Sequence, residues 1–481
     1  MTRLKFDFRH RRLFVDLFGR DVYAVGGFVR DVILGRPAAE VDILVTGHDL
    51  NDIVARLQAR GRVDLVGRSF GIIKFTVEGR TYDVAMPRRD RPAGRVRRGH
   101  KDFLIDTNPC LPVEKDLERR DFRTNSMALR LADGLLVDPF GGRDDTLKRR
   151  ISLTNPAAFP EDPLRVLRAA RFASVLEFRL DPAVYRAAWE VDLSGLSVER
   201  INDELFRLLL LSRRPSRGLD ELWKLGALSR LFPELEALSL TIQDASFHPE
   251  KDAFGHHTVW AHTKLAVDQA SALAGILGFT EAKKLALLLA ALYHDAGKAV
   301  ATRWELRRGR MVVASNGHDI QSERIARKVF QRFRIYSWNG FDLAGVVPLL
   351  IRTHHRAGEL WLNRHEVTKK AFNRLAAEVN GEIELVVALD AADRAGRRTR
   401  IVTGLDREAR WLLKRFAELR VNRETIRPLV MGRHLLELGV KPGPEMGRLL
   451  KRLYRLQLDG SFETLEGGVA AARRLLARGK R

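Results

Sequence analysis

The residues best suited to chemistry lie close together near the start of the chain, in the stretch GGFVRDVILGRPAAEVD. Glu40 and Asp42 share one face if this part is a strand, because side chains alternate along a strand. Two carboxylates that close repel each other unless a cation lies between them, and Mg²⁺ prefers carboxylate and phosphate oxygens. Gly26 and Gly27 let a backbone approach a phosphate, and Arg30 can add a charge-assisted hydrogen bond. The stretch therefore predicts a site for a triphosphate and its metal ions.

A second group of charged residues follows in RRDFRTN, which contains Arg120, and in EDPLRVLRAARF. Arg165, Arg168 and Arg171 are three positions apart and follow Asp162, so on a helix they form one charged stripe. An acid and an arginine together offer acceptors and donors to the edge of a base. Taken alone, the stripe is better explained as a solvated helix face with ion pairs.

Histidine and aspartate recur further along, in HPEKDAFGHHT, YHDAGK, GHD, RTHH and DAAD. Imidazole nitrogens and carboxylate oxygens can bind one or two metal ions. His294 and Asp295 are adjacent and form the centre of the pattern, and His257 and Asp393 would complete a single site. Thirteen histidines in 481 residues make chance pairs common, so buried histidines with structural hydrogen bonds are the alternative.

The elements that would position these residues change character along the chain. Up to Asp138, short runs predict strands at YAVGG and EVDILVTG, a helix at FVRDVILG and a hairpin at GIIKFTVEGRTYDVAMP. Beyond Asp138 the pattern is helical almost to the end. Pro163 suits the first turn of a helix whose apolar face includes Leu164 and Leu167. Residues 88–101 carry seven positive side chains and one acid, which predicts a solvated loop.

Length and composition narrow the class of protein. A chain of 481 residues with 45% hydrophobic residues predicts two to four globular domains. The longest apolar run, Leu285–Tyr293, is too short to cross a membrane, and the N-terminus has no secretory signal. The single cysteine, Cys110, excludes an internal disulfide, and a net charge of +23 favours a polyanionic partner such as nucleic acid. We therefore expect a cytoplasmic protein without membrane contact.

In their order, the motifs GGFVRD, EVD, RRDFRTN, VDPFGG and EDPLRVLRAARF resemble those of the class II tRNA nucleotidyltransferase (CCA-adding enzyme) and bacterial poly(A) polymerase family, over residues 20–235. The resemblance implies that Gly27 and Arg30 hold the triphosphate. It also implies that Glu40 and Asp42 are catalytic and bind Mg²⁺. Asp83, on the predicted hairpin, would be a third carboxylate that the family does not require.

The resemblance extends to the contacts with the incoming nucleotide, and it has two departures. Asp162 and Arg165 would read the base. Glu40 stands where the family usually has aspartate, so we expect shifted metal geometry rather than lost activity. Arg123 and Thr124 replace a threonine and an aliphatic residue, so Arg123 affects either local packing or phosphate contacts. The residues implied to contact the nucleotide are Arg120, Asp162, Arg165, Arg168 and Arg171.

The downstream histidines and aspartates resemble the H…HD…D ligand pattern of HD phosphohydrolase domains, which implies a divalent transition metal such as Ni, Mn or Co. His257 is preferred to His256 as the first ligand because Thr258 follows it, as in the family. His318 and either His354 or His355 match the extra histidines of two-metal members. The segment from LVMGRHLLELG to FETLEGG resembles the tail of HD-containing bacterial CCA-adding enzymes. The four implied metal ligands are His257, His294, Asp295 and Asp393.

The expected fold class is α+β, with a mixed β-sheet and helices in the head and all-α parts after it. Four parts are expected: a nucleotidyltransferase head (1–145), a helical neck that selects the nucleotide and binds RNA (146–235), an HD domain (236–400) and a helical tail (401–481). The resemblance implies template-independent addition of C, C and A to the tRNA 3′ end from CTP and ATP, with release of pyrophosphate. The HD domain would add phosphatase or 2′,3′-cyclic phosphodiesterase activity.

Several other functions fit parts of the same pattern. The nearest are a bacterial poly(A) polymerase and an enzyme that adds only CC or only A. A signalling hydrolase whose head merely binds nucleotides, or an RNA-binding module without chemistry, belongs to a different class. The expected partners are the acceptor arm and 3′ end of tRNA, together with CTP and ATP, and the sequence gives no oligomeric state.

Overall fold

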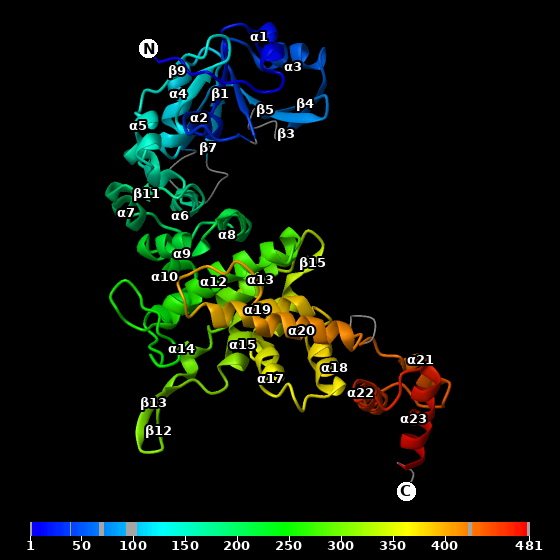
Figure 1. Ribbon diagram of the computed structural model, residues 1–481. Coiled ribbons are helices and arrows are strands. Elements are labelled where there is room, and N and C mark those ends of the chain that lie inside the picture. The colour runs from blue at the N-terminus through cyan, green and yellow to red at the C-terminus, as the bar shows by residue number, and fades with distance from the viewer. Residues whose placement is uncertain (1, 39, 67–71, 93–102, 422–425, 479–481) are drawn as a thin grey trace. The chain divides into compact units, whose positions relative to one another are not determined.

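The computed structural model describes residues 2–38, 40–66, 72–92, 103–421 and 426–478 (Figure 1). The chain divides into two compact units. The first comprises Met1–Ser212 and Arg217–Leu231, and the second comprises Arg213–Ser216 and Phe232–Arg481. The first unit contains a sheet with helices and the second is mainly helical, so the α+β fold class is confirmed. The division into four parts stays a prediction.

A seven-stranded mixed sheet forms the head, in the order β3-β4-β5-β2-β1-β8-β9. Its central strands are β1 (Val22–Val25), β2 (Asp42–Val45) and β5 (Arg80–Ala85), and β2 pairs with β5 in parallel. All other pairs in this sheet are antiparallel. The remaining strands are β3 (Arg62–Val66), β4 (Ile72–Val77), β8 (Ala128–Arg130) and β9 (Leu136–Val137).

Apolar side chains of the sheet and its helices make one core. Phe14 of α1 (Arg11–Phe18), Ile53 of α3 (Leu50–Gln58) and Phe75 of β4 are fully buried in it. The predicted hairpin is confirmed: β4 and β5 are joined by Glu78 and Gly79, both with positive φ, as a tight two-residue turn requires.

Two local expectations for the head need correction. The predicted strand at EVDILVTG begins only at Asp42, so Glu40 lies before β2 rather than on it. Part of the predicted basic loop is a strand, because β6 (Arg88–Pro92) pairs with β7 (Phe103–Thr107). The rest of that expectation, residues 93–101, lies outside the described residues.

Helices dominate the rest of the first unit. The predicted helix after Pro163 is α6 (Leu164–Leu176), whose buried face includes Leu164 and Leu167. It packs against α8 (Val198–Leu211). The other elements are α2 (Gly27–Ile33), α4 (Val113–Glu118), η2 (Arg123–Asn125), α5 (Gly142–Leu147), β10 (Arg150–Ile151), η3 (Pro156–Glu161), β11 (Arg179–Leu180), α7 (Pro182–Trp189), α9 (Pro215–Lys224) and α10 (Ala227–Leu231).

The second unit is built around α13 (Glu281–Tyr293), whose residues 285–293 are all buried. This explains the apolar run in the sequence, because a helix surrounded by other helices is apolar on every side. Its neighbours are α12 (Val259–Ile276), α16 (Leu343–Thr353) and α19 (Ile383–Ala395). No described helix is long and apolar enough to cross a bilayer.

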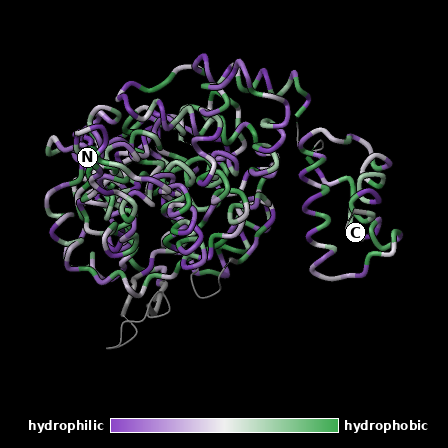
Figure 2. The backbone as a smooth tube through the Cα atoms, turned by 90° about the horizontal axis from the view of Figure 1, so that it is seen from below, coloured by the Kyte–Doolittle hydropathy of each residue, from purple (hydrophilic) through white to green (hydrophobic). Residues whose placement is uncertain are grey.

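Shorter elements surround these helices. They are α11 (Pro233–Glu236), η4 (Ala237–Ser239), α14 (Lys298–Ala301), β12 (Arg303–Arg307), β13 (Arg310–Ala314), α15 (His318–Arg332), β14 (Ser337–Trp338), β15 (Phe341–Asp342), α17 (Arg356–Leu362), α18 (Lys369–Glu378) and α20 (Arg407–Glu418). The tail consists of α21 (Gly432–Leu436), α22 (Pro444–Leu458) and α23 (Leu465–Arg478), around a core that includes Leu435, Leu453 and Ala472. Green and purple alternate along its tube in Figure 2, as expected of amphipathic helices.

Candidate nucleotide and metal sites

Three carboxylates gather at the start of β2. Asp42 lies opposite Val25 of β1 on one side and Asp83 of β5 on the other. Desolvation by the surrounding chain raises the pKa of Asp42, which remains accessible to solvent. The charge of Arg120 lowers this pKa, but the charges of Asp83 and Glu40 raise it, and the result lies above the usual value. A carboxyl group whose ionised form is disfavoured in this way gains from a bound cation. The residues at the start of β2 therefore fit a divalent metal ion.

Gly26 forms the floor between Asp42 and Arg120. It has a φ of 71°, and a Cβ added to it would lie 3.0 Å from Nη1 of Arg120 and 3.7 Å from Oδ2 of Asp42. Arg120 is in turn held by the fully buried carboxylate of Asp116, with 3.1 Å between Nη2 and Oδ2. The structure thus places the positive charge of Arg120 beside Asp42, with only the backbone of Gly26 between them. Asp116 was not found from the sequence.

Arg30 is buried, and three of its five N–H groups are already engaged. Nε and Nη2 donate to the carboxylate of Asp31 at 3.0 and 3.1 Å, and Nη1 donates to Oδ1 of Asn125 at 3.0 Å. A Cβ on Gly27 would lie 3.3 Å from Nη2 of Arg30, so this glycine lies directly over the guanidinium group. Phosphate contact by Gly27 and Arg30 stays a prediction.

The charged stripe on α6 is a network of ion pairs and hydrogen bonds. Asp162 accepts from Arg200 of α8 at 2.9 Å, and Arg171 pairs with the buried Glu204 of the same helix. Arg168 donates to Asp121 at 2.7 Å, which outweighs the effect of burial and holds the pKa of Asp121 below its usual value. These contacts suit the helix-face alternative, and nucleotide contact by the stripe stays a prediction.

Arg165 connects this stripe to the head. Its guanidinium donates to the backbone carbonyls of Ala158 and Arg119. Because Arg119 precedes Arg120, the contact links α6 to the arginine beside Asp42. Arg123, one of the departures from the family, donates from Nε to the carbonyl of Leu153 at 3.1 Å. Its visible role is therefore local packing.

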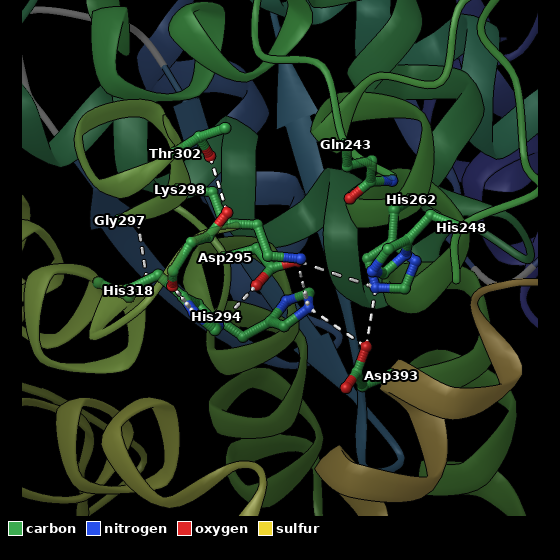
Figure 3. A network of polar contacts seen from close by, with 12 residues as sticks. Gln243, His248, His262, His294, Asp295, Gly297, Lys298, Thr302, His318 and Asp393 are labelled. Carbon is green, nitrogen blue, oxygen red and sulfur yellow. Dashed lines mark hydrogen bonds and ion pairs between the residues drawn. The ribbon is translucent and has the colours of Figure 1, made fainter. Parts of the chain in front are cut away.

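Four buried side chains converge in the second unit, as Figure 3 shows. His262 of α12, His294 and Asp295 at the end of α13, and Asp393 of α19 point toward one another. Nε2 of His262 lies 2.8 Å from Oδ1 of Asp393, and Nε2 of His294 lies 3.3 Å from Oδ2 of Asp295. Nδ1 of His294 donates to the carbonyl of Ala291 at 2.8 Å. Nε2 is therefore the ring nitrogen that is placed to bind a metal ion.

This group has the donor set of a divalent metal site. Within the described residues, the buried Nε2 of His294 makes no well-aligned hydrogen bond, although the carboxylates of Asp295 and Asp393 lie 3.3 and 3.7 Å from it. Such an atom calls for an explanation, and a metal ion provides one. Burial lowers the pKa of His294, but the charges of Asp295 and Asp393 outweigh it and raise the pKa to about 10. A metal ion bound to Nε2 would take the place of the proton that the two acids otherwise favour there.

The structure places His262, and not the predicted first ligand His257, beside His294 and Asp393. His257 lies just before Thr258, the N-cap of α12, and its Nδ1 is 2.9 Å from the carbonyl oxygen of His248. His262 lies on the buried face one turn into the helix and joins His294 and Asp393. Both histidines are followed by threonine, so that signal does not distinguish them. The apolar spacing within α12 would have favoured His262.

Glu250, which the sequence did not single out, contacts Nδ1 of His262, while Nε2 of the same ring faces Asp393. Oε1 of the buried Glu250 lies 2.8 Å from Nδ1 of His262 and 3.0 Å from Nδ1 of His248. A carboxylate behind the ring fixes the orientation of a ligating histidine. Lys298, 2.7 Å from Oδ2 of Asp295, is a further member of the network.

A second histidine group adjoins the first. His318, His354 and His355 have ligand atoms within 4.8 Å of one another. His354 and His355, the two alternatives for the histidine that accompanies His318, therefore both lie in this group. Nε2 of His318 is 3.3 Å from Oδ1 of Asp295, and Nδ1 of His355 is 4.0 Å from Oδ2 of Asp393. The two aspartates therefore lie between the two histidine groups, an arrangement that can hold two ions.

Comparison with known families matches three parts of the chain. Residues 22–152 match the Poly A polymerase head domain, residues 178–238 match the probable RNA and SrmB-binding site of polymerase A, and residues 259–395 match the HD domain. A nucleotidyltransferase head and an HD domain both imply dependence on divalent metal ions.

Comparison with curated proteins identifies the family. A multifunctional CCA protein of Dechloromonas aromatica (strain RCB) is 35% identical over 350 residues, which cover 70% of this chain and 75% of that protein. The chain belongs to the multifunctional CCA protein family. Another member, from Xanthomonas campestris pv. campestris (strain B100), is 38% identical over 289 residues, which cover 58% of this chain and 64% of that protein. The chain thus spans 64% of the length of that relative.

Solved structures of CCA-adding enzymes share the fold of this member of the multifunctional CCA protein family. The CCA-adding enzyme of Bacillus stearothermophilus in complex with CTP aligns with a TM-score of 0.61 over 98% of this chain and 97% of that chain, at 24% identity. The CCA-adding enzyme of Thermotoga maritima, complexed with tRNA, aligns with a TM-score of 0.53 over 97% and 95%, at 20% identity. At these identities the likeness establishes the fold alone.

The placement of His262 leads to a direct prediction about metal binding. His262→Ala should weaken metal binding in the second unit by more than roughly 10- to 100-fold. That smaller loss is typical when the replaced residue contacts a metal ligand and not the metal itself. His257→Ala is the matched control and should keep its metal, because its ring faces the carbonyls of His248 and Glu250. Elemental analysis of the two purified variants checks this. Loss of metal from the His257 variant alone would restore the original assignment.

Proposed function

We propose that this chain is a CCA-adding tRNA nucleotidyltransferase of the cytoplasm, which adds C, C and A to the tRNA 3′ end from CTP and ATP and releases pyrophosphate. The observation that carries the proposal is the meeting of Asp42, Glu40 and Asp83 with Gly26 and Arg120, on the sheet of a poly(A) polymerase head. Membership of the multifunctional CCA protein family supports the choice of tRNA.

The acids, glycines and arginine of the head would have different roles in nucleotidyl transfer. Mg²⁺ held by Glu40 and Asp42 would activate the 3′-hydroxyl and neutralise charge on the phosphates. Gly26 and Gly27 let the backbone approach the triphosphate, and Arg120 supplies a fixed positive charge that Asp116 holds in place. Catalysis is then mainly positioning and charge stabilisation.

Base selection is assigned to the charged face of α6. Asp162 and Arg165 would read the base, and Arg168 and Arg171 would complete the nucleotide site with Arg120. The pairs of Asp162 and Arg171 with α8, and of Arg168 with Asp121, hold these side chains in fixed positions, which base reading requires as well as a packed helix face.

Replacement of Arg165 tests this assignment. Arg165→Ala should change the ratio of CTP to ATP incorporation by about 5- to 150-fold, because losing a buried hydrogen-bond partner costs about 1–3 kcal/mol. Binding of tRNA should change much less. Arg165→Lys is the control, since it keeps the charge but not the planar fork that donates to two acceptors. Equal small losses for both nucleotides would mean that Arg165 only supports the helix.

The HD domain is proposed to hydrolyse phosphoesters at RNA ends. His262, His294, Asp295 and Asp393 would hold one transition metal, Ni, Mn or Co, and the second histidine group would hold another. Such ions lower the pKa of bound water and orient phosphate oxygens. The proposed substrates are 2′,3′-cyclic phosphates and phosphate monoesters, as an enzyme that rebuilds tRNA ends would meet.

Release of pyrophosphate provides the test of the main proposal. With tRNA that lacks its CCA end, release should require CTP for the first additions and ATP for the last. Mature tRNA should support none. Release with ATP alone, in amounts far above one per tRNA, would instead identify a poly(A) polymerase.

A further inference from the structure

A second feature of the HD region is a cavity of about 760 Å³ beside the end of α19. One wall is the segment 394–403, which follows the proposed ligand Asp393. The other wall includes Ser246, Phe247 and Pro249. This second segment leads into Glu250, which contacts His262. Each wall is therefore within a few residues, along the chain, of Asp393 or of Glu250, which contacts His262.

The backbone of the first wall is held from inside the protein. Gln269 of α12 is fully buried, and its Nε2 lies 3.3, 3.2 and 2.9 Å from the carbonyl oxygens of Ala395, Arg398 and Arg400. Its Oε1 accepts from the backbone N–H of Val402 at 2.9 Å. One side chain thus fixes the path of the whole segment. The side chains of Arg397, Arg398 and Arg400 in this segment are exposed.

The cavity carries an excess of positive charge. Arg397, Arg398 and Arg400 line it and make no ion pair with any residue in the described part of the chain. The acid at its rim, Asp406, is already paired with Arg394 at 2.9 Å and caps α20. Three arginines without acidic partners in one cavity favour an anion with several negative charges.

An aromatic side chain narrows the choice of anion. Phe247 lines the cavity and is 64% exposed, so its ring is open to a ligand. Unpaired bases stack on aromatic side chains while arginines follow the phosphates, which is how proteins grip single-stranded RNA. A volume of about 760 Å³ admits a nucleotide unit.

We infer that this cavity binds the phosphodiester backbone of a single-stranded RNA end and presents its terminal phosphate to the HD metal group. The inference rests on the proposed phosphohydrolase function. It names the substrate class as an RNA strand of several nucleotides, in contrast to a free nucleotide.

Two substrates with the same reactive group separate these classes. One is 2′,3′-cyclic CMP, and the other is a short RNA that ends in the same cyclic phosphate. For the full-length wild-type protein, kcat/KM should be higher for the RNA. The triple variant Arg397→Ala, Arg398→Ala, Arg400→Ala should lose this preference about tenfold or more. The salt dependence of log(kcat/KM) for the RNA should become shallower by about two, for three phosphate contacts.

The triple Arg→Lys variant is the matched control, because it keeps the charge and should keep most of the preference. The thermal unfolding midpoint reports that each variant is folded. An equal loss for both substrates, or an unchanged preference, would overturn the inference.

A crosslinking experiment tests RNA binding in the cavity independently of hydrolysis. RNA ending in 4-thiouridine should crosslink to peptides containing Phe247 or residues 396–402 of the wild-type protein. Crosslinks confined to the head would overturn the inference. Absence of hydrolysis by the wild type would refute the phosphohydrolase proposal, while the crosslinks would still test the cavity.

Discussion

Asp42→Ala should lower the rate of nucleotide addition by about 1,000-fold or more, because metal ions supply several kcal/mol to such reactions and each 1.4 kcal/mol is tenfold. The fold should survive, since Asp42 is the first residue of β2 and its side chain is accessible to solvent. Removing this acid also relieves repulsion with Glu40 and Asp83. The variant should therefore bind tRNA nearly as well as the wild type.

Single-turnover extension of a labelled tRNA measures this effect, with tRNA affinity determined in parallel. Glu40→Asp is the matched control. It restores the shorter acid usual in the family and should retain activity or increase it. Normal addition by Asp42→Ala with Mg²⁺ present would contradict the metal assignment in the head.

His294→Ala and Asp295→Ala should each lower phosphoester hydrolysis by about 1,000-fold or more, because each removes a proposed ligand of the HD metal. Nucleotide addition should remain near the wild-type rate, since the head carries its own acids. Metal content should fall together with hydrolysis. The loss follows from chemistry rather than unfolding if the remaining nucleotide addition is intact.

Hydrolysis of a 2′,3′-cyclic phosphate, measured after loading with Ni, Mn, Co or Mg in turn, checks this prediction. Elemental analysis of the same samples gives the metal content. Full hydrolysis by the Asp295 variant would assign the activity to the head or to a contaminant. A wild-type protein that hydrolyses no phosphoester with any of the four metals would rule out the HD proposal.

Local patterns in the sequence predicted the head well. The strand before Gly26, the helix at Arg30 and the hairpin at Asp83 depend on alternation and turn residues, which neighbouring residues determine. The limits of β2 were less predictable. Glu40 lies before the strand, because pairing with β1 begins only at Asp42.

Contacts between distant segments could not be predicted from spacing. Glu204 holds Arg171 because α6 packs on α8, and nothing in the sequence pairs these two residues. Asp116 and Arg120, in contrast, are four positions apart, so helical spacing could have paired them. The prediction of His257 in preference to His256 overlooked His262 for a related reason. It rested on a short motif, whereas position along α12 decides which ring is buried.

The order of nucleotides added to a tRNA that lacks its last three residues tests the central claim most directly. The purified protein would receive CTP alone, ATP alone or both, and sequencing of the tRNA 3′ ends would read the products. We expect two C residues with CTP alone, no addition with ATP alone, and CCA followed by a stop with both. A lengthening run of A residues with ATP alone, or a stop after CC with both nucleotides, would contradict it.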